Sequence, residues 1–161
     1  MIEPKEEFMR AAIEEAVKAK NSGDYAIGAV VIKGGVIIAR GTNRSKIEKD
    51  ATQHAEIVAI REASKTLDSR YLEGCILYTT HEPCPMCSAA AVWAKLRGVV
   101  FGARIGDMEE YERHNGNDLW KWRVINISAR EVFEKVLGKE RHHVEISEGF
   151  MRDECRKLFH S

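Results

Sequence analysis

The chain has 161 residues and a mass of 18.2 kDa, and its 25 basic and 25 acidic side chains give a formal net charge of zero at pH 7. Because a chain of this size buries most of its surface around one core, we expect a single domain over residues 1–161. The composition excludes a disordered or collagen-like protein, no apolar run reaches the ~20 residues of a membrane span, and the zero charge argues against a large anionic partner.

The first half of the chain predicts alternating helices and strands. Pro4 suits the first turn of a helix, and Gly34-Gly35 between two β-branched runs is typical of a hairpin, because glycine adopts positive φ at no steric cost. In chain order the predicted elements are a helix from Pro4 to about residue 21, strands over 27–33 and 36–40, a polar loop over 42–51, a helix over about 53–65 and a strand over 75–80. The acidic residues at the amino terminus are unlike a secretory signal, so we expect a cytoplasmic protein.

The second half continues this alternation. Pro85 opens a helix whose apolar run over 89–94 predicts burial on nearly all sides. Ser128, with Glu131 three residues later, forms a capping-box pattern. The predicted elements are a helix over 85–95, a strand over 97–103, a long functional loop over 105–124, a helix over 128–138, a short strand over 144–146 and a helix over 148–159. Alternating helices and strands imply an α/β sandwich, with the first two strands antiparallel and the later ones parallel.

Three residues have the chemistry of a catalytic zinc site: His54, Cys84 and Cys87. Catalytic zinc commonly takes three protein ligands and leaves its fourth position to water, whereas structural sites are closed by a fourth ligand. Glu56 would lie about 200° away from His54 on a regular helix, so we predict that the helix begins at His54 and carries Glu56 in its first turn. A carboxylate placed there can take a proton from water and return it to a substrate.

These residues form a recognisable pattern. His54-Ala-Glu56 with Pro83-Cys-Pro-Met-Cys87 matches the H-x-E…P-C-x-x-C signature of zinc nucleobase deaminases. Together with the flanking segments 27–30, 51–53, 77–82 and 99–103, it makes the chain resemble the cytidine and deoxycytidylate deaminase superfamily, in the branch that holds guanine, cytosine and tRNA adenosine deaminases.

The resemblance implies a fold, a reaction and further site residues. The fold would be a cytidine deaminase-like three-layer α/β/α sandwich with a five-stranded mixed sheet, and the protein would be a homodimeric zinc-dependent aminohydrolase. The backbone N–H groups of Ala55 and Cys84 would face the reacting atoms, and Asn43 would contact the substrate ring. Without that resemblance, a loop asparagine is more typical of a turn.

The sequence favours a small substrate. Trp93 resembles the tryptophan of guanine deaminases, and Asp118 lies in a stretch that resembles their acidic loop, where it would carry a proton or bind the amine; a core role for Trp93 and a plain surface role for Asp118 stay open. Residues 103–124 carry four basic and five acidic side chains, a poor cradle for phosphates. We therefore expect a free base or a nucleoside-like substrate, guanine-like first and cytosine-like second, with nucleic acid a less probable partner and no membrane.

Two alternatives remain. A tRNA-specific adenosine deaminase is favoured by Ile27 and by residues 143–155, which resemble the tRNA enzymes, but we expect the latter run to act as scaffold. A zinc-stabilised interaction module without activity requires that the open coordination position be unused. The insertion over 109–141 is longer than in the compact tRNA enzymes that the chain resembles and would serve as a lid over the pocket, with Trp120 or Trp122 stacking on the base or anchoring the loop.

Overall fold

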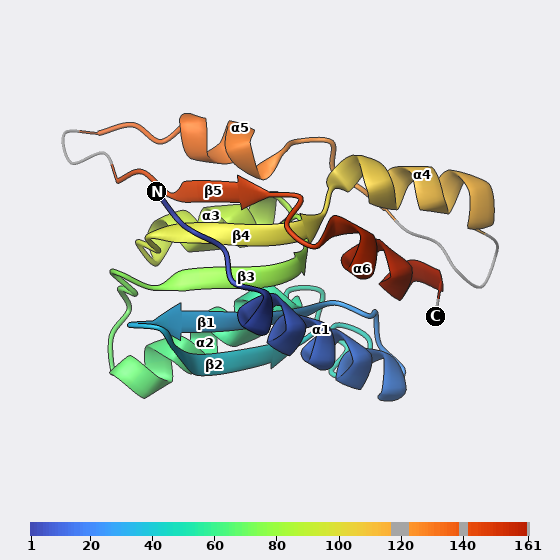
Figure 1. The fold of residues 1–161 in the computed structure, drawn as a ribbon, viewed down its shortest axis with the longest axis horizontal. Coiled ribbons are helices and arrows are strands. Elements are labelled where there is room, and N and C mark those ends of the chain that lie inside the picture. The colour runs from blue at the N-terminus through green and yellow to red at the C-terminus, as the bar shows by residue number, and fades with distance from the viewer. Residues whose placement is uncertain (117–122, 139–141, 161) are drawn as a thin grey trace.

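The computed structural model describes residues 1–116, 123–138 and 142–160, and these form one five-stranded sheet with helices on both faces (Figure 1). The strands are β1 (Gly28–Lys33), β2 (Val36–Thr42), β3 (Ile76–His81), β4 (Gly98–Ala103) and β5 (Glu145–Glu148). The helices are α1 (Glu6–Asn21), α2 (Ala55–Leu67), α3 (Pro85–Trp93), α4 (Ile105–Asn115), α5 (Ala129–Glu134) and α6 (Arg152–Arg156), followed by a 3₁₀ helix, η1 (Lys157–His160). Within these residues, no helix is long and apolar enough to cross a membrane.

The strand order is β2-β1-β3-β4-β5, and it determines where the loops gather. β1 is antiparallel to both of its neighbours, while β3, β4 and β5 are parallel. Since β2 and β3 both run opposite to β1, their carboxyl ends lie at the same edge of the sheet. The helices that follow these two strands, α2 and α3, therefore begin side by side at that edge.

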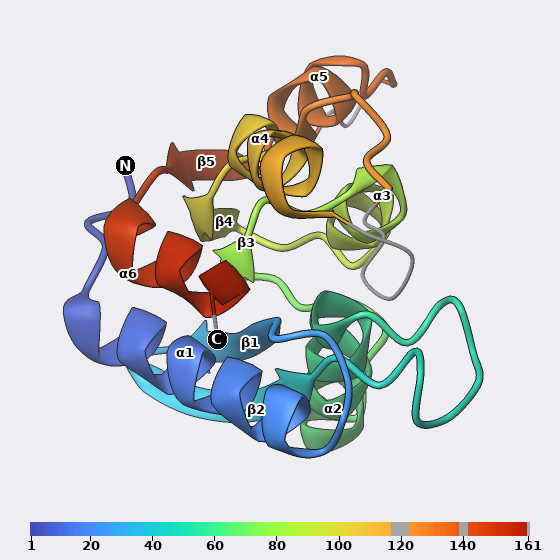
Figure 2. The same ribbon diagram turned by 90° about the vertical axis from the view of Figure 1, so that its right-hand side faces the viewer.

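The sheet separates two apolar layers (Figure 2). α1 and α6 cover one face, and α2, α3 and α5 cover the other. Helices approach the strands closely at two glycines, where a Cβ on Gly28 would lie 2.1 Å from the Ala12 carbonyl oxygen and one on Gly41 would lie 2.3 Å from that of Ala55. The expected three-layer α/β/α sandwich with a mixed sheet is confirmed.

The structure corrects the prediction of a long loop over 105–124, because residues 105–115 form α4. Two buried carboxylates hold the start of this helix: Glu82 Oε2 accepts from the Ile105 N–H at 2.9 Å, and Asp107 Oδ2 accepts from the Arg104 N–H at 2.9 Å. The last predicted helix is also shorter than expected, since Met151 has a positive φ of 54° directly before α6.

Candidate metal centre and active site

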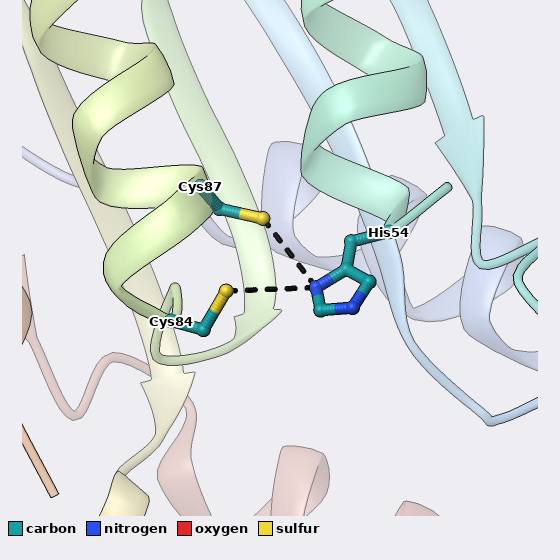
Figure 3. A group of neighbouring side chains, drawn as sticks. All are labelled: His54, Cys84 and Cys87. Atoms are coloured by element: carbon teal, nitrogen blue, oxygen red, sulfur yellow. Dashed lines mark hydrogen bonds between the residues drawn. The ribbon is translucent and has the colours of Figure 1, made fainter. Parts of the chain in front are cut away.

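Three potential metal ligands converge where α2 and α3 begin (Figure 3). His54 precedes α2 in extended geometry, with φ −73° and ψ 152°, as the sequence predicts. Cys84 precedes α3 in a similar conformation, and Cys87 lies in the first turn of that helix. The His54 Nδ1 atom is 3.6 Å from each of the two sulfur atoms, and all three ligand atoms lie within 4.8 Å of one another.

This spacing fits a zinc ion. With Zn–N near 2.05 Å, Zn–S near 2.3 Å and tetrahedral angles, a zinc ion would hold nitrogen and sulfur about 3.6 Å apart. The separations of 3.6 Å between the His54 nitrogen and the two sulfurs agree with that edge length. Two thiols and one imidazole are also a donor set that suits zinc and leaves its fourth position open.

The electrostatics of the cluster favour a thiolate at Cys84. A hydrogen bond from Cys87 is the main cause that lowers the pKa of the Cys84 thiol to about 4, and the bond to His54 acts in the same direction. The bond with Cys84 in turn raises the pKa of His54. Both shifts describe surroundings that stabilise a thiolate at Cys84, the form that binds a metal. The same hydrogen bond with Cys84, together with burial, raises the pKa of the Cys87 thiol well above its usual value, so the negative charge is concentrated on Cys84.

Glu56 lies beside these ligands in the first turn of α2 and is only 4% exposed. Burial is the main cause that raises the pKa of its carboxyl group. Its Oε1 atom accepts a hydrogen bond from Thr79 at 3.1 Å, and its Oε2 atom is 3.6 Å from the Cys87 sulfur. The structure thus places a protonatable carboxyl group directly against the metal-binding group.

Asn43 is buried rather than exposed in a turn, with 1% of its surface accessible. Its Nδ2 atom donates to Asp24 Oδ1 at 2.7 Å and to Ser45 Oγ at 3.0 Å. The following residue, Arg44, donates its N–H to the carbonyl of Gln53 at 2.9 Å, and this bond joins the Asn43 loop to the residue before His54. Asn43 therefore belongs to the same edge of the sheet as the metal-binding group.

Sequence reasoning missed two residues of this site, Asp24 and Thr79. The carboxylate of Asp24 is buried and accepts four hydrogen bonds, three from backbone N–H groups and one from Asn43. Thr79 stands in a buried strand and contacts Glu56. The polar run Thr79-Thr80-His81 in a strand predicted to be buried was a signal for Thr79, and none marked Asp24.

Of the remaining predicted site residues, Ala55 adjoins the cluster through its backbone, whereas Trp93 lies away from it. Ala55, the first residue of α2, is fully buried, and its N–H lies at a helix start that has no carbonyl partner within the helix. Trp93 is 78% exposed at the end of α3 opposite the cysteines, so the alternative of a core role is excluded, and its predicted contact with substrate stays a prediction. Asp118, Trp120 and Trp122 lie outside the described residues.

The structure also changes the meaning of the charge count over residues 103–124. Asp107 is 4% exposed and accepts hydrogen bonds from the Arg152 guanidinium at 2.8 and 2.5 Å, so it adds no negative charge to the surface. Glu109 pairs with Arg113 at 2.9 Å. Among the described residues of this segment, three basic and three acidic side chains then lie outside the core (Arg104, Arg113, Arg123, Glu109, Glu110 and Glu112), so the acidic surplus is absent there and no longer argues against phosphates.

Comparisons with known proteins agree with this site. Residues 2–103 match the family model of the cytidine and deoxycytidylate deaminase zinc-binding region. The chain is 37% identical over 148 residues to the tRNA-specific adenosine deaminase of Bacillus subtilis (strain 168), a match that covers 92% of this chain and 81% of that protein. It is 43% identical over 106 residues to the guanine deaminase of the same strain, covering 65% of this chain and 68% of that protein.

A solved structure of a tRNA deaminase is similar to this chain over nearly its whole length. It comes from work on A-to-I editing by tRNA:A34 deaminases at the wobble position of transfer RNA, and it matches with a TM-score of 0.74 and 32% identity over 96% of this chain and 99% of that one. The family match confirms zinc as the cofactor and an aminohydrolase as the type of enzyme.

The expected substrate and partner are contradicted by these matches. The preference for a free guanine-like or cytosine-like base, with nucleic acid as the less probable partner, is wrong, because relatives matched over most of their length are tRNA-specific adenosine deaminases. That expectation rested on the likeness of Trp93 and Asp118 to guanine deaminases, on a charge count along one segment that included the buried Asp107, and on treating residues 143–155 as scaffold.

Proposed function

We propose, from the premise that this chain belongs to the cytidine and deoxycytidylate deaminase family, that it converts adenosine to inosine in transfer RNA. The observation that carries the proposal is similarity above 30% identity along the whole chain: 99% of the wobble-position deaminase structure and 81% of the Bacillus subtilis tRNA enzyme are covered. We place the reacting adenosine at the wobble position, which is the position edited by the structural relative.

We propose that residues 1–161 act as one zinc-dependent deaminase domain. Both apolar layers support this, because each combines residues from the first and the last thirds of the chain. A tRNA substrate and two reduced cysteines at the metal centre both favour a cytoplasmic location.

The residues proposed to hold zinc are His54 through Nδ1 and the two cysteines of the Cys84-Pro-Met-Cys87 turn. When bound, zinc acts as a Lewis acid that lowers the pKa of water to near neutrality. Glu56 takes a proton from water and delivers it to a ring nitrogen of adenine. Its burial keeps bulk water from competing for that proton.

Two further sets of groups contact the substrate: backbone N–H groups that stabilise charge and a side chain that orients the base. The N–H groups at the starts of α2 and α3, on Ala55 and Cys84, are available to donate to the developing negative charge. Asn43 uses its amide nitrogen to bind Asp24 and Ser45, so its Oδ1 atom is left to accept a hydrogen bond from the base. Asp24 fixes this orientation, because an amide oxygen facing a carboxylate would be repelled.

The experiment uses two anticodon hairpins that differ only at the wobble position, one with adenosine and one with guanosine. The zinc-loaded protein should convert the adenosine hairpin to inosine, detected by mass spectrometry of the digested RNA. The Glu56→Gln protein is the control for contaminating activity. Absence of inosine, together with ammonia release from free guanine, would show that the substrate assignment is wrong.

A further inference from the structure

Thr79 lies at a position where the sheet otherwise places apolar residues. It shares a face of β3 with Leu77, which belongs to the apolar layer under α2 and α3. Its register neighbours on the adjoining strands are Ala29 and Phe101, both in that layer. Thr79 is fully buried, so its hydroxyl group needs a partner inside the protein.

The hydroxyl group has two acceptors within reach and only one hydrogen. Glu56 Oε1 lies 3.1 Å from Thr79 Oγ1, and the carbonyl oxygen of His81 lies 3.2 Å away. A carboxylate accepts a stronger hydrogen bond than a neutral carbonyl. Thr79 therefore donates to Glu56 whenever that carboxyl group is ionised.

The two oxygens of Glu56 have different neighbours. Oε1 faces the strand and Thr79, while Oε2 lies 3.6 Å from the Cys87 sulfur, on the side of the metal-binding group. A thiolate that binds a metal has no proton to donate. In the zinc-loaded protein the Cys87 contact is therefore lost as a hydrogen bond, and the bond from Thr79 remains.

We propose that Thr79 is a positioning residue for the deamination reaction: its hydroxyl group holds Glu56 Oε1 against β3, so that Oε2 faces the metal centre and carries the transferred proton. The inference rests on the proposed function, since it assigns Glu56 the proton transfer. A valine in the same place would fill the same volume but leave the carboxylate without this donor and free to rotate.

The chain offers a matched control on the same strand. Thr80 is also fully buried, but it faces the other layer, where its Oγ1 atom accepts from the Gly28 N–H at 3.2 Å and lies 2.7 Å from His81 Nδ1. Thr80→Val removes a buried hydroxyl group without touching Glu56. This variant therefore shows how much thermal stability and activity change when a buried hydroxyl group is lost outside the active site.

The experiment compares Thr79→Val, Thr79→Ser and Thr80→Val with the parent protein, with every rate divided by bound zinc so that only loaded molecules are counted. Thr79→Val should lower kcat on the adenosine hairpin roughly 10- to 100-fold with KM within about twofold, the usual effect of losing a group that orients an active-site residue. Thr79→Ser, which keeps the hydroxyl group, should stay within about threefold of the parent. Thr80→Val should melt at a lower temperature and keep the parent kcat.

A crystal structure of the zinc-loaded Thr79→Val protein separates this inference from the choice of substrate. We expect the Glu56 carboxylate to turn away from the position it has in the parent. An unchanged carboxylate, or a Thr79→Val kcat equal to that of the parent, would overturn the role of Thr79. A parent protein that leaves the hairpin unmodified would instead overturn the proposed substrate. If Thr79→Val binds no zinc, Thr79→Ala replaces it in both measurements.

Discussion

The edge of the sheet that holds the metal-binding group and the helical region after residue 103 arrange their polar residues in different ways. At the edge, short local motifs place three potential ligands at two neighbouring helix starts. After residue 103, the decisive contacts join residues far apart in the chain, such as Asp107 with Arg152. Local motifs can be recognised in the sequence. Long-range contacts cannot, and they determine which charged side chains reach the surface, so a charge count along the sequence differs from the charge at the surface.

Loss of a metal ligand should have the largest effect on activity, because the metal-binding group at the edge of the sheet would no longer hold zinc. Cys84→Ala should lower bound zinc from about one ion per chain to near zero and abolish inosine formation. Elemental analysis and the hairpin assay measure the two quantities. Cys75→Ala is the control, since Cys75 is also a free cysteine, fully buried where Cys84 is half-buried, and lies just before β3, at its other end. A Cys84→Ala protein with full zinc content would exclude Cys84 as a ligand.

Loss of the carboxyl group should stop the reaction without emptying the metal site. Glu56→Gln should reduce kcat by roughly 10²- to 10⁴-fold, the range typical of a general acid–base residue, with zinc content unchanged. Glu62→Gln provides the comparison, because Glu62 lies on the same helix with its side chain 49% exposed and paired with Lys65. Equal activity of the Glu56→Gln and parent proteins would remove Glu56 from the mechanism.

A glycine substitution in each region should change stability in opposite directions. Gly41→Ala places a Cβ 2.3 Å from the Ala55 carbonyl oxygen, so α2 must shift, and we expect a loss of about 2 kcal/mol or more. Gly106→Ala in α4 meets no atom within 4 Å and should gain about 0.5 kcal/mol from higher helix propensity. Urea unfolding measures both, and a neutral Gly41→Ala would show that α2 tolerates displacement.

An effect smaller than that of Gly41→Ala concerns His81, which lies where the two regions meet and whose ring centroid is 4.8 Å from that of Phe159. Burial lowers the pKa of His81 to about 3, from 6.5 when unfolded. Below pH 6.5 the unfolded chain therefore takes up a proton that the folded protein excludes. The free energy of unfolding decreases as the pH is lowered from about 6.5 to about 3. From pH 7 to 5.5 the parent should lose about 1 kcal/mol more than His81→Gln. Parallel pH curves for the two proteins would mean that His81 is not buried in its neutral form.

The motif residues explain why so much of the metal centre was predictable. Two cysteines separated by Pro-Met at a helix start, and a histidine two residues before a glutamate, allow few arrangements that bring all four side chains together. The prediction that the helix begins after His54 followed from helix geometry alone and is confirmed. Apart from α4, the order of helices and strands was also predictable, because apolar periodicity and glycine turns are local properties.

Other features depended on contacts that no local pattern encodes. The start of α4 is held by Glu82, 23 residues earlier in the chain, so a polar stretch looked like a loop. The apolar run over 89–94 predicted a helix buried on nearly all sides, yet α3 exposes Trp93 to solvent. The charge argument for a small substrate failed for the same reason, since the charge of Asp107 is neutralised by an arginine 45 residues away.

The measurement that tests the account most directly is the ratio of kcat/KM for an anticodon hairpin with a wobble adenosine to kcat/KM for free guanine, on one zinc-loaded preparation. We predict inosine in the hairpin, no ammonia from guanine, and a hairpin rate that falls as salt rises, because binding phosphates releases counterions. Turnover of guanine with an unmodified hairpin would contradict the account.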